Sequence, residues 1–344
     1  MKAAVVSSFD TAPRCADFPD PVAGGRDEMV VSVVAAGLHP RVRSQANGSH
    51  YTSTGVLPLV PGIDGVGRDA DGRLRYFVLP EDAAAGSMAE RVVIDARRSV
   101  VLPPGTDPLM VAAAMNPAMS SWVALRQRIQ FTAGSTVLVL GATGNAGRMA
   151  VQVARLLGAG EVIAAARDAG LLAGLAALGA TSTLLLDPGS GDPGSAGAGA
   201  GAGAGASADA GADAVEGRLG PAAAGVDVVL DYLWGQPAAT LLAGLIRARA
   251  DGGRPLTWIE IGSVAGPVAP IPSAALRAAR LQLVGSGQGS VPARAILAEL
   301  PELAREISKG TFGIDVRAVP LDDVEQAWAD AARSRQRIVI TPAA

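Results

Sequence analysis

Three glycines spaced three residues apart are the strongest chemical signal in this sequence. Thr136–Gly147 reads TVLVLGATGNAG, so an apolar run leads directly into Gly141, Gly144 and Gly147. The first glycine permits a tight turn, the second lets the backbone approach a ligand, and the third lets a helix pack close to a strand. Free N–H groups at the start of that helix attract anions, which predicts a pyrophosphate site for a dinucleotide. A tight turn with no ligand is the alternative. The residues expected to contact the cofactor here are Gly141, Thr143, Gly144, Asn145, Ala146 and Gly147.

A second signal follows Gly147 by about 20 residues, where NAD sites usually carry an acidic residue that binds the ribose hydroxyls. This chain has Arg167 at that position. Because an arginine can pair with a 2′-phosphate, it favours NADPH over NADH as the cofactor. Asp168 is adjacent and could bind the ribose instead, so NADH stays open. A solvated ion pair is the other interpretation of Arg167.

A parallel sheet would position these residues. From Thr136 onward, short apolar runs without alternation are interleaved with helical patterns, as expected for a sheet covered by helices on both faces. The sequence therefore predicts an α/β fold with a Rossmann-type doubly wound parallel sheet. The predicted strands are Thr136–Leu140, Glu161–Ala166, Thr183–Leu186, Val226–Leu230, Thr257–Ile261 and Gln282–Val284. The predicted helices between them are Ala146–Leu157, Ala169–Leu178 and Pro237–Ala250.

The chain before Pro108 is instead rich in short strand patterns separated by proline and glycine turns, which indicates a small twisted barrel. We expect residues 1–119 to form this β-rich domain, completed by 290–344, and residues 120–289 to form the dinucleotide-binding domain. The last strand, Arg337–Thr341, is expected to return to the barrel. Residues 189–213 contain an Ala-Gly repeat. They cannot bury enough apolar area to offset their ordering entropy, so we expect a flexible insertion.

Composition excludes several classes of function. The formal net charge is −3 and only 3% of residues are aromatic, which argues against a nucleic-acid partner. One cysteine and two histidines cannot form an intramolecular disulfide or a multi-histidine metal site. No run reaches the ~20 apolar residues of a membrane span, and the N-terminus lacks the apolar core of a signal peptide. We expect a cytoplasmic protein with no membrane partner.

Five further segments match one family pattern. They are Leu57–Gly67 (LPLVPGIDGVG), Gly86–Val93 (GSMAERVV), Met119–Leu125 (MSSWVAL), Asp227–Asp231 (DVVLD) and Glu260–Ser263 (EIGS). Together with the glycine turn, they make the chain resemble the medium-chain dehydrogenase/reductase superfamily, and most closely its zinc-independent quinone oxidoreductase branch. The resemblance implies a GroES-like barrel beside the Rossmann-type domain, and a homodimer.

The resemblance also implies that no metal is used. Zinc-dependent members carry a cysteine after the glycine that corresponds to Gly37, and a Gly-His-Glu motif. Here Leu38 follows Gly37, and the second motif reads Gly62-Ile63-Asp64. Without a Lewis acid, an alkoxide intermediate lacks stabilisation. We therefore expect hydride delivery to a small-molecule substrate that delocalises charge itself, a quinone or an α,β-unsaturated carbonyl.

The candidate catalytic residues are Tyr51 and His39. In the quinone oxidoreductases an asparagine follows the pair that corresponds to Gly37-Leu38, and this chain has His39 there. Tyr51 matches the family's tyrosine with an offset of one residue. Either side chain could donate a proton or orient a carbonyl. Water as the proton source, and ordinary packing or capping roles for both residues, are the alternatives.

The resemblance adds further cofactor contacts: Ser120, Tyr232, Leu233, Gly262, Ser263, Ser286, Gly287 and Arg337. A surface charge is the alternative for Arg337. The expected activity is an NADPH-dependent, metal-independent reductase. A specialised biosynthetic reductase on the same scaffold and a non-catalytic NADPH-binding sensor are the alternatives.

Overall fold

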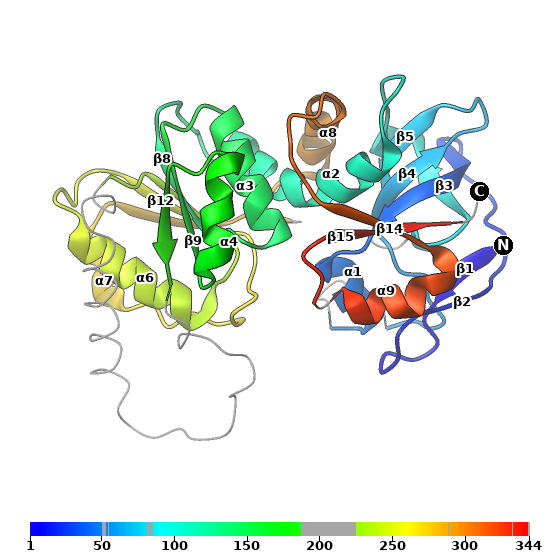
Figure 1. The fold of residues 1–344 in the computed structure, drawn as a ribbon, viewed down its shortest axis with the longest axis horizontal. Coiled ribbons are helices and arrows are strands. Elements are labelled where there is room, and N and C mark those ends of the chain that lie inside the picture. The colour runs from blue at the N-terminus through cyan, green and yellow to red at the C-terminus, as the bar shows by residue number, and fades with distance from the viewer. Residues whose placement is uncertain are drawn as a thin grey trace. The chain divides into compact units, whose positions relative to one another are not determined.

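The computed structural model describes residues 1–49, 53, 55–80, 83, 85–186, 225–287, 289–331 and 333–342. Tyr51 and the insertion predicted at 189–213 lie outside the described residues. The chain divides into two compact units (Figure 1). The first unit comprises Met1–Met119 and Ile296–Ala344, and the second comprises Ser120–Ala295. Among the described residues, no helix is both long and apolar enough to cross a bilayer.

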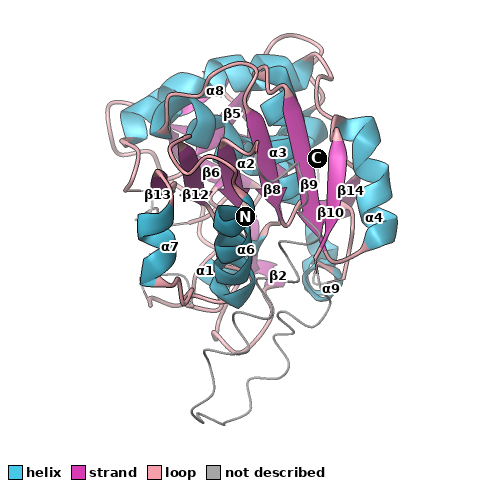
Figure 2. Ribbon diagram, turned by 90° about the vertical axis from the view of Figure 1, so that its left-hand side faces the viewer, coloured by secondary structure: helices cyan, strands magenta, loops and turns pink. Residues whose placement is uncertain are grey.

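The second unit contains a six-stranded sheet with the order β10-β9-β8-β11-β12-β13. Every neighbouring pair is parallel, and β8, β9 and β10 are seen side by side in Figure 2. This confirms the predicted doubly wound parallel sheet. The strands are β8 (Thr136–Leu140), β9 (Glu161–Ala166), β10 (Ser182–Leu185), β11 (Val228–Asp231), β12 (Leu256–Glu260) and β13 (Leu281–Gly285). The helical segments are η2 (Ala124–Arg128), α3 (Asn145–Leu156), α4 (Ala169–Ala173), η3 (Gly174–Leu178), α6 (Gly235–Ala248) and α7 (Ser273–Ala278).

Burial explains why the strands of this sheet are apolar throughout. All five residues of β8 are buried, because helices cover both faces of a doubly wound sheet. Leu138, Trp258 and Leu245 belong to one core cluster that joins β8, β12 and α6. The two edge strands are exceptions, since Ser182, Thr183 and Leu185 of β10 and Gln282 and Leu283 of β13 are exposed. The prediction of strands covered on both faces is therefore wrong for β10 and β13.

The first unit contains a seven-stranded sheet in which β14-β15-β3-β4-β5-β7 are neighbours and β6 pairs with β3. The strand Arg337–Thr341 forms β15 and pairs antiparallel with β3, so the predicted return to the barrel is confirmed. The strands are β1 (Lys2–Val5) and β2 (Arg14–Asp17), which pair separately, and β3 (Glu28–Gly37), β4 (Asp64–Arg68), β5 (Leu74–Val78), β6 (Arg91–Asp95), β7 (Ser99–Val101), β14 (Val316–Pro320) and β15 (Arg337–Thr341). The helical segments are α1 (Pro40–Ala46), η1 (Ala96–Arg98), η4 (Leu321–Asp323) and α9 (Val324–Asp330). Two further helices, α2 (Pro108–Val123) and α8 (Ala293–Ser308), have residues in both units.

Two of the family segments pack against each other through glycines. A Cβ atom on Gly86 would lie 2.4 Å from the backbone of Pro61. A Cβ atom on Gly62, which has a φ of +116°, would lie 2.4 Å from Ser87 Oγ. Only glycine permits so close an approach of the two backbones. This contact fixes the segment that leads into β4, and therefore the position of Asp64.

Candidate functional site

The carboxyl ends of the parallel strands gather most of the predicted cofactor residues. Because the strands of the second unit are parallel, the residues that follow each strand lie at the same edge of the sheet. This edge carries the Gly141–Gly147 turn after β8 and Arg167 after β9. It also carries Tyr232, Leu233, Gly262, Ser263, Ser286 and Gly287, which follow β11, β12 and β13.

The glycine turn leaves the start of α3 without a side-chain cap. Gly141 has a φ of +75°, and a Cβ atom on Gly147 would lie 2.2 Å from the Gly141 carbonyl oxygen. Gly144 occupies the N-cap position of α3 with extended backbone, and it has no side chain to accept from the N–H groups of the first helical turn. Those N–H groups are therefore suited to an anion.

Asp168 has a structural task at the end of β9. It is the N-cap residue of α4, and its Oδ1 accepts a hydrogen bond of 3.0 Å from the backbone N–H of Leu171. Arg167 and Asp168 are both exposed. Asp168 was the residue that left NADH as an alternative cofactor. One oxygen of its carboxylate is engaged in capping a helix.

A buried carboxylate supports the loop after β11. Asp231 is fully buried, and its Oδ1 accepts hydrogen bonds from the backbone N–H groups of Leu233 (2.8 Å) and Trp234 (2.9 Å). Its Oδ2 accepts from Trp258 Nε1 at 2.9 Å. Burial raises the pKa of Asp231, although these hydrogen bonds oppose the shift. Sequence analysis noted this residue only as part of a matching strand and missed its role.

The hydrogen bonds of Asp231 hold a strained backbone. Trp234 has a φ of 52°, in the left-handed region that residues other than glycine rarely adopt. The same loop places Leu233 against the glycine turn, since a Cβ atom on Gly141 would lie 3.1 Å from Leu233 Cδ2. Asp231 therefore positions two predicted cofactor residues, Tyr232 and Leu233, relative to that turn.

Ser120 and Tyr232, predicted separately as cofactor contacts, are joined by a hydrogen bond. Ser120 Oγ lies 2.9 Å from the Tyr232 hydroxyl. Burial raises the pKa of Tyr232 to about 12, so the phenol keeps its proton at neutral pH. The structure thus brings together two residues that are 112 positions apart.

The first unit contains a buried hydrogen-bonded group that we call the His39–Asp64–Tyr76 cluster. His39 is 3% exposed, and its Nε2 lies 3.1 Å from Asp64 Oδ1. The Tyr76 hydroxyl donates to Asp64 Oδ2 at 2.8 Å. The pairing of β4 with β5 sets this geometry, because Val66 is opposite Tyr76 and Asp64 is its diagonal neighbour. His39 occupies the N-cap position of α1, but its side chain makes no capping hydrogen bond. The His39 side chain therefore does not cap the helix.

Arg337 lies buried close to this cluster and is not a surface charge. It is 4% exposed, and its Nη1 donates to the Leu38 carbonyl at 3.2 Å. Burial lowers the pKa of Arg337 to about 10, against the attraction of Asp64, so it stays charged at neutral pH. Burial also lowers the pKa of His39, an effect that Asp64 opposes and that Arg337 and Arg41 reinforce.

Asp64 and Tyr76 were missed as site residues by sequence analysis. Asp64 was noticed only because it stands in place of a zinc-motif glutamate. The available signal was an acidic residue at the first position of the buried strand β4. A buried carboxylate requires hydrogen-bond partners, which would have pointed to a polar cluster.

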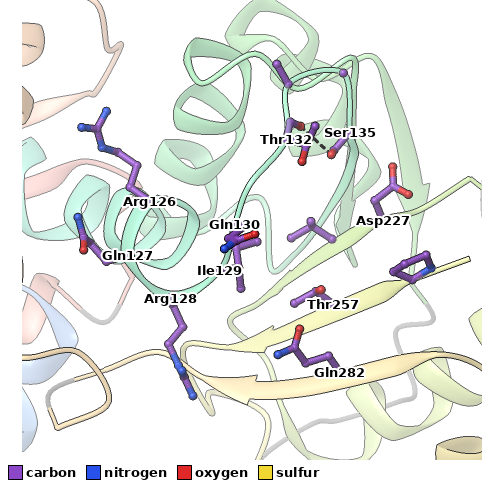
Figure 3. A pocket seen from close by; sticks show the side chains of 14 residues that line it. Arg126, Gln127, Arg128, Ile129, Gln130, Thr132, Ser135, Asp227, Thr257 and Gln282 are labelled. Atoms are coloured by element: carbon purple, nitrogen blue, oxygen red, sulfur yellow. Dashed lines mark hydrogen bonds between the residues drawn. The ribbon is translucent and has the colours of Figure 1, made fainter.

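A polar pocket of about 880 Å³ lies elsewhere in the second unit, at the amino ends of the strands (Figure 3). Asp227 lines it, but Asp227 Oδ1 is paired with Arg254 at 2.7 Å and Oδ2 accepts from the backbone N–H of Thr136. None of the predicted site residues lines this pocket. Its labelled lining residues are Arg126, Gln127, Arg128, Ile129, Gln130, Thr132, Ser135, Asp227, Thr257 and Gln282.

The fold and the glycine turn define a Rossmann-type α/β protein that also contains a β-rich unit. No family model matches the chain. It is 31% identical to a protein of Emericella nidulans named a probable NADPH-dependent quinone reductase, tdiC, over 99% of this chain and 100% of the relative. It is 27% identical to 2-methylene-furan-3-one reductase of Solanum lycopersicum over 45% of this chain and 43% of the relative. Among solved structures, the quinone oxidoreductase of Thermus thermophilus, also solved in complex with NADPH, matches with a TM-score of 0.75 at 27% identity, over 99% of this chain and 100% of that one. This chain therefore belongs to the quinone oxidoreductases of the medium-chain dehydrogenase/reductase superfamily, as its resemblance predicted.

Proposed function

We propose that this chain is an NADPH-dependent reductase that transfers hydride to a quinone or an α,β-unsaturated carbonyl. The observation that carries the proposal is the full-length similarity to a protein named a probable NADPH-dependent quinone reductase. The glycine turn at the carboxyl edge of the sheet supports it. Two relatives that match part of the chain support enones as substrates: the tomato reductase and an NADPH-dependent alkenal/one oxidoreductase of Arabidopsis thaliana, which is 29% identical over 41% of this chain.

The residues at the carboxyl edge fit NADPH. The N–H groups at the start of α3 would bind the diphosphate, and Arg167, an exposed cation after β9, would pair with the 2′-phosphate. When bound, NADPH supplies the hydride. We assign Tyr232 and Leu233 to the adenosine side. The remaining assigned contacts are Ser120, Gly262, Ser263, Ser286 and Gly287. Arg337, which the sequence predicted as a further contact, lies in the first unit and donates a hydrogen bond to the Leu38 carbonyl, so we do not assign it to the cofactor.

We further propose that the reaction uses no metal ion. Leu38 and Ile63 stand where zinc-dependent relatives carry a cysteine and a histidine, and neither side chain can ligate zinc. Conjugation in the substrate would spread the charge that hydride addition creates. We assign Tyr51 and His39 to the substrate side as the candidate catalytic residues. In this proposal the first unit binds substrate and the second binds NADPH.

We also propose a homodimer that forms through the edge strand β13. β13 has a strand partner on one side only in the described part of the chain, and Leu283 on it is 38% exposed. An open edge offers N–H and C=O groups to another strand, and a second copy would supply one by antiparallel pairing. We place the protein in the cytoplasm, where a single unpaired cysteine is ordinary.

Stopped-flow loss of NADPH absorbance tests the proposed function directly. The full chain, saturated with NADPH, is mixed with a panel of quinones and enones. We expect rapid oxidation with at least one member of the panel. Tight NADPH binding without oxidation by any acceptor would support the sensor alternative and contradict a reductase.

A further inference from the structure

The surroundings of Asp64 restrict which atom of His39 carries a proton. The two oxygens of Asp64 have different partners: Oδ1 faces His39 Nε2, and Oδ2 accepts from the Tyr76 hydroxyl. A carboxylate only accepts hydrogen bonds, so the proton shared with Oδ1 belongs to the imidazole. A neutral imidazole has one N–H group. If that group is at Nε2, then Nδ1 carries only a lone pair.

The charges around the cluster favour this neutral form. Asp64 on β4 bonds to His39, and Arg337 on β15 and Arg41 on α1 act on it through their charges, whereas Tyr76 on β5 bonds to the other oxygen of Asp64. Arg337 is as deeply buried as His39, and its positive charge is attracted by Asp64. A proton added to His39 would therefore leave a buried positive charge without a counterion, which is strongly unfavourable.

We infer that Asp64, Tyr76 and Arg337 are positioning residues that hold His39 as the neutral Nε2–H tautomer, with Nδ1 as a hydrogen-bond acceptor. In the proposed reduction, His39 then does not deliver the proton. Hydride adds to the β-carbon of an enone, the C=C electron pair forms a double bond to the carbonyl carbon while the C=O π pair moves onto oxygen, and the resulting enolate takes one proton from water or from a hydroxyl such as that of Tyr51. A quinone takes hydride and one proton in the same way to give a hydroquinone. The statement about the reduction rests on the proposed function, whereas the tautomer does not.

Nuclear magnetic resonance of the histidine ring tests the inference without an activity assay. The full chain has only two histidines, so [¹⁵N]histidine labelling with His50→Gln assigns the His39 nitrogens unambiguously. Between about pH 5 and 8, long-range ¹H–¹⁵N correlations should show a protonated Nε2 and an unprotonated Nδ1, with and without NADPH. An imidazolium pattern with a midpoint near the ordinary value of about 6.5, or a proton on Nδ1, would overturn it.

Variants of Arg337 separate its charge from its packing. Arg337→Gln removes the positive charge, so the midpoint of His39 should rise by about one pH unit, a tenfold gain in proton affinity. Arg337→Lys keeps the charge and should leave the His39 pattern unchanged. Tyr76→Phe should also raise the midpoint of His39, because Asp64 loses a hydrogen-bond donor and then stabilises an imidazolium better. If Arg337→Gln does not fold, Tyr76→Phe provides the test instead. A midpoint that none of the folded variants shifts would contradict the positioning role.

Kinetics then links the tautomer to the reaction. The pH profile of kcat/KM should show no step from His39 in the wild type, whereas Arg337→Gln should gain a step at the midpoint measured for His39. A wild-type step that tracks protonation of His39 would make it the proton donor and overturn the inference. Absence of reductase activity together with the predicted nitrogen pattern would remove the proposed function and leave the tautomer assignment intact.

Discussion

Arg167 and Asp168 are adjacent at the end of β9, yet their side chains are committed differently. Asp168 caps α4 through Oδ1, and the proposal assigns the neighbouring Arg167 to the 2′-phosphate of NADPH. A charge-assisted contact of this kind contributes roughly 1.5–3 kcal/mol, which corresponds to more than a tenfold change in affinity.

Arg167→Ala should therefore raise the KM for NADPH more than tenfold while it changes the KM for NADH little. Initial rates with both cofactors, measured against the same acceptor, check this. Arg167→Lys, which keeps the charge, should lose less. An equal loss for NADPH and NADH would contradict the assignment.

Single residues were predictable where their role is local. Gly141 and Gly147 could be assigned from the sequence because a positive φ and a close helix–strand contact depend on neighbouring residues. Asp64 and Tyr76 could not, because their hydrogen bond depends on the register between β4 and β5. The catalytic assignments of His39 and Tyr51 remain predictions, and Tyr51 lies outside the described residues.

At the scale of elements, the loop after β11 depends on one buried carboxylate. Asp231→Ala would leave the N–H groups of Leu233, Trp234 and Trp258 without their acceptor. The free energy of unfolding should fall by at least about 2 kcal/mol, as measured by chemical denaturation, and NADPH binding should weaken. Asp231→Asn retains an acceptor oxygen and should lose less. Unchanged stability of Asp231→Ala would show that the loop does not rely on Asp231.

The raised pKa of Asp231 gives a pH dependence with a definite sign. The folded state takes up a proton on Asp231 at a higher pH than the unfolded state does. In the unfolded state the pKa of an aspartate is about 3.9. The contribution of Asp231 to stability therefore falls as pH rises from about 4 through the raised pKa. The free energy of unfolding lost in Asp231→Asn should shrink across this window in denaturation series. A loss that grows with pH would contradict the direction of the shift.

Elements with strong local patterns were predicted well. β8, β9 and β15 have the bounds that the sequence predicted, because their apolar runs end at clear turns. The predicted helix Ala169–Leu178 instead becomes α4 followed by the 3₁₀ segment η3. The strand β14, Val316–Pro320, was missed because arginine and proline interrupt its apolar pattern and its pairing with β15 is distant in the chain.

At the scale of the whole molecule, the open edge of β13 decides the proposed assembly. The backbone N–H of Ser286 donates to Glu260 on β12, so by alternation the N–H of Leu283 points away from the sheet. Leu283→Pro should remove a donor from the dimer interface without breaking the β12–β13 pairing. We expect a dimer for the wild type and a monomer for this variant in analytical ultracentrifugation.

Leu283→Thr keeps the N–H group and should remain dimeric. A monomeric wild type, or a Leu283→Pro variant that stays dimeric at the same concentration, would contradict assembly through this edge. Reductase activity measured on both variants would then show whether the dimer matters for turnover.

Calorimetric titration of NADPH into the full chain tests the central claim, that a diphosphate binds at the Gly141–Gly147 turn. Gly147→Ala places a methyl group 2.2 Å from the Gly141 carbonyl oxygen and must distort the turn. Gly174→Ala is a matched control, because a Cβ atom there meets nothing within 4 Å. We predict saturable NADPH binding by the wild type and Gly174→Ala, and loss of binding by a folded Gly147→Ala. No binding by the wild type, or equal binding by all three proteins, would contradict the claim.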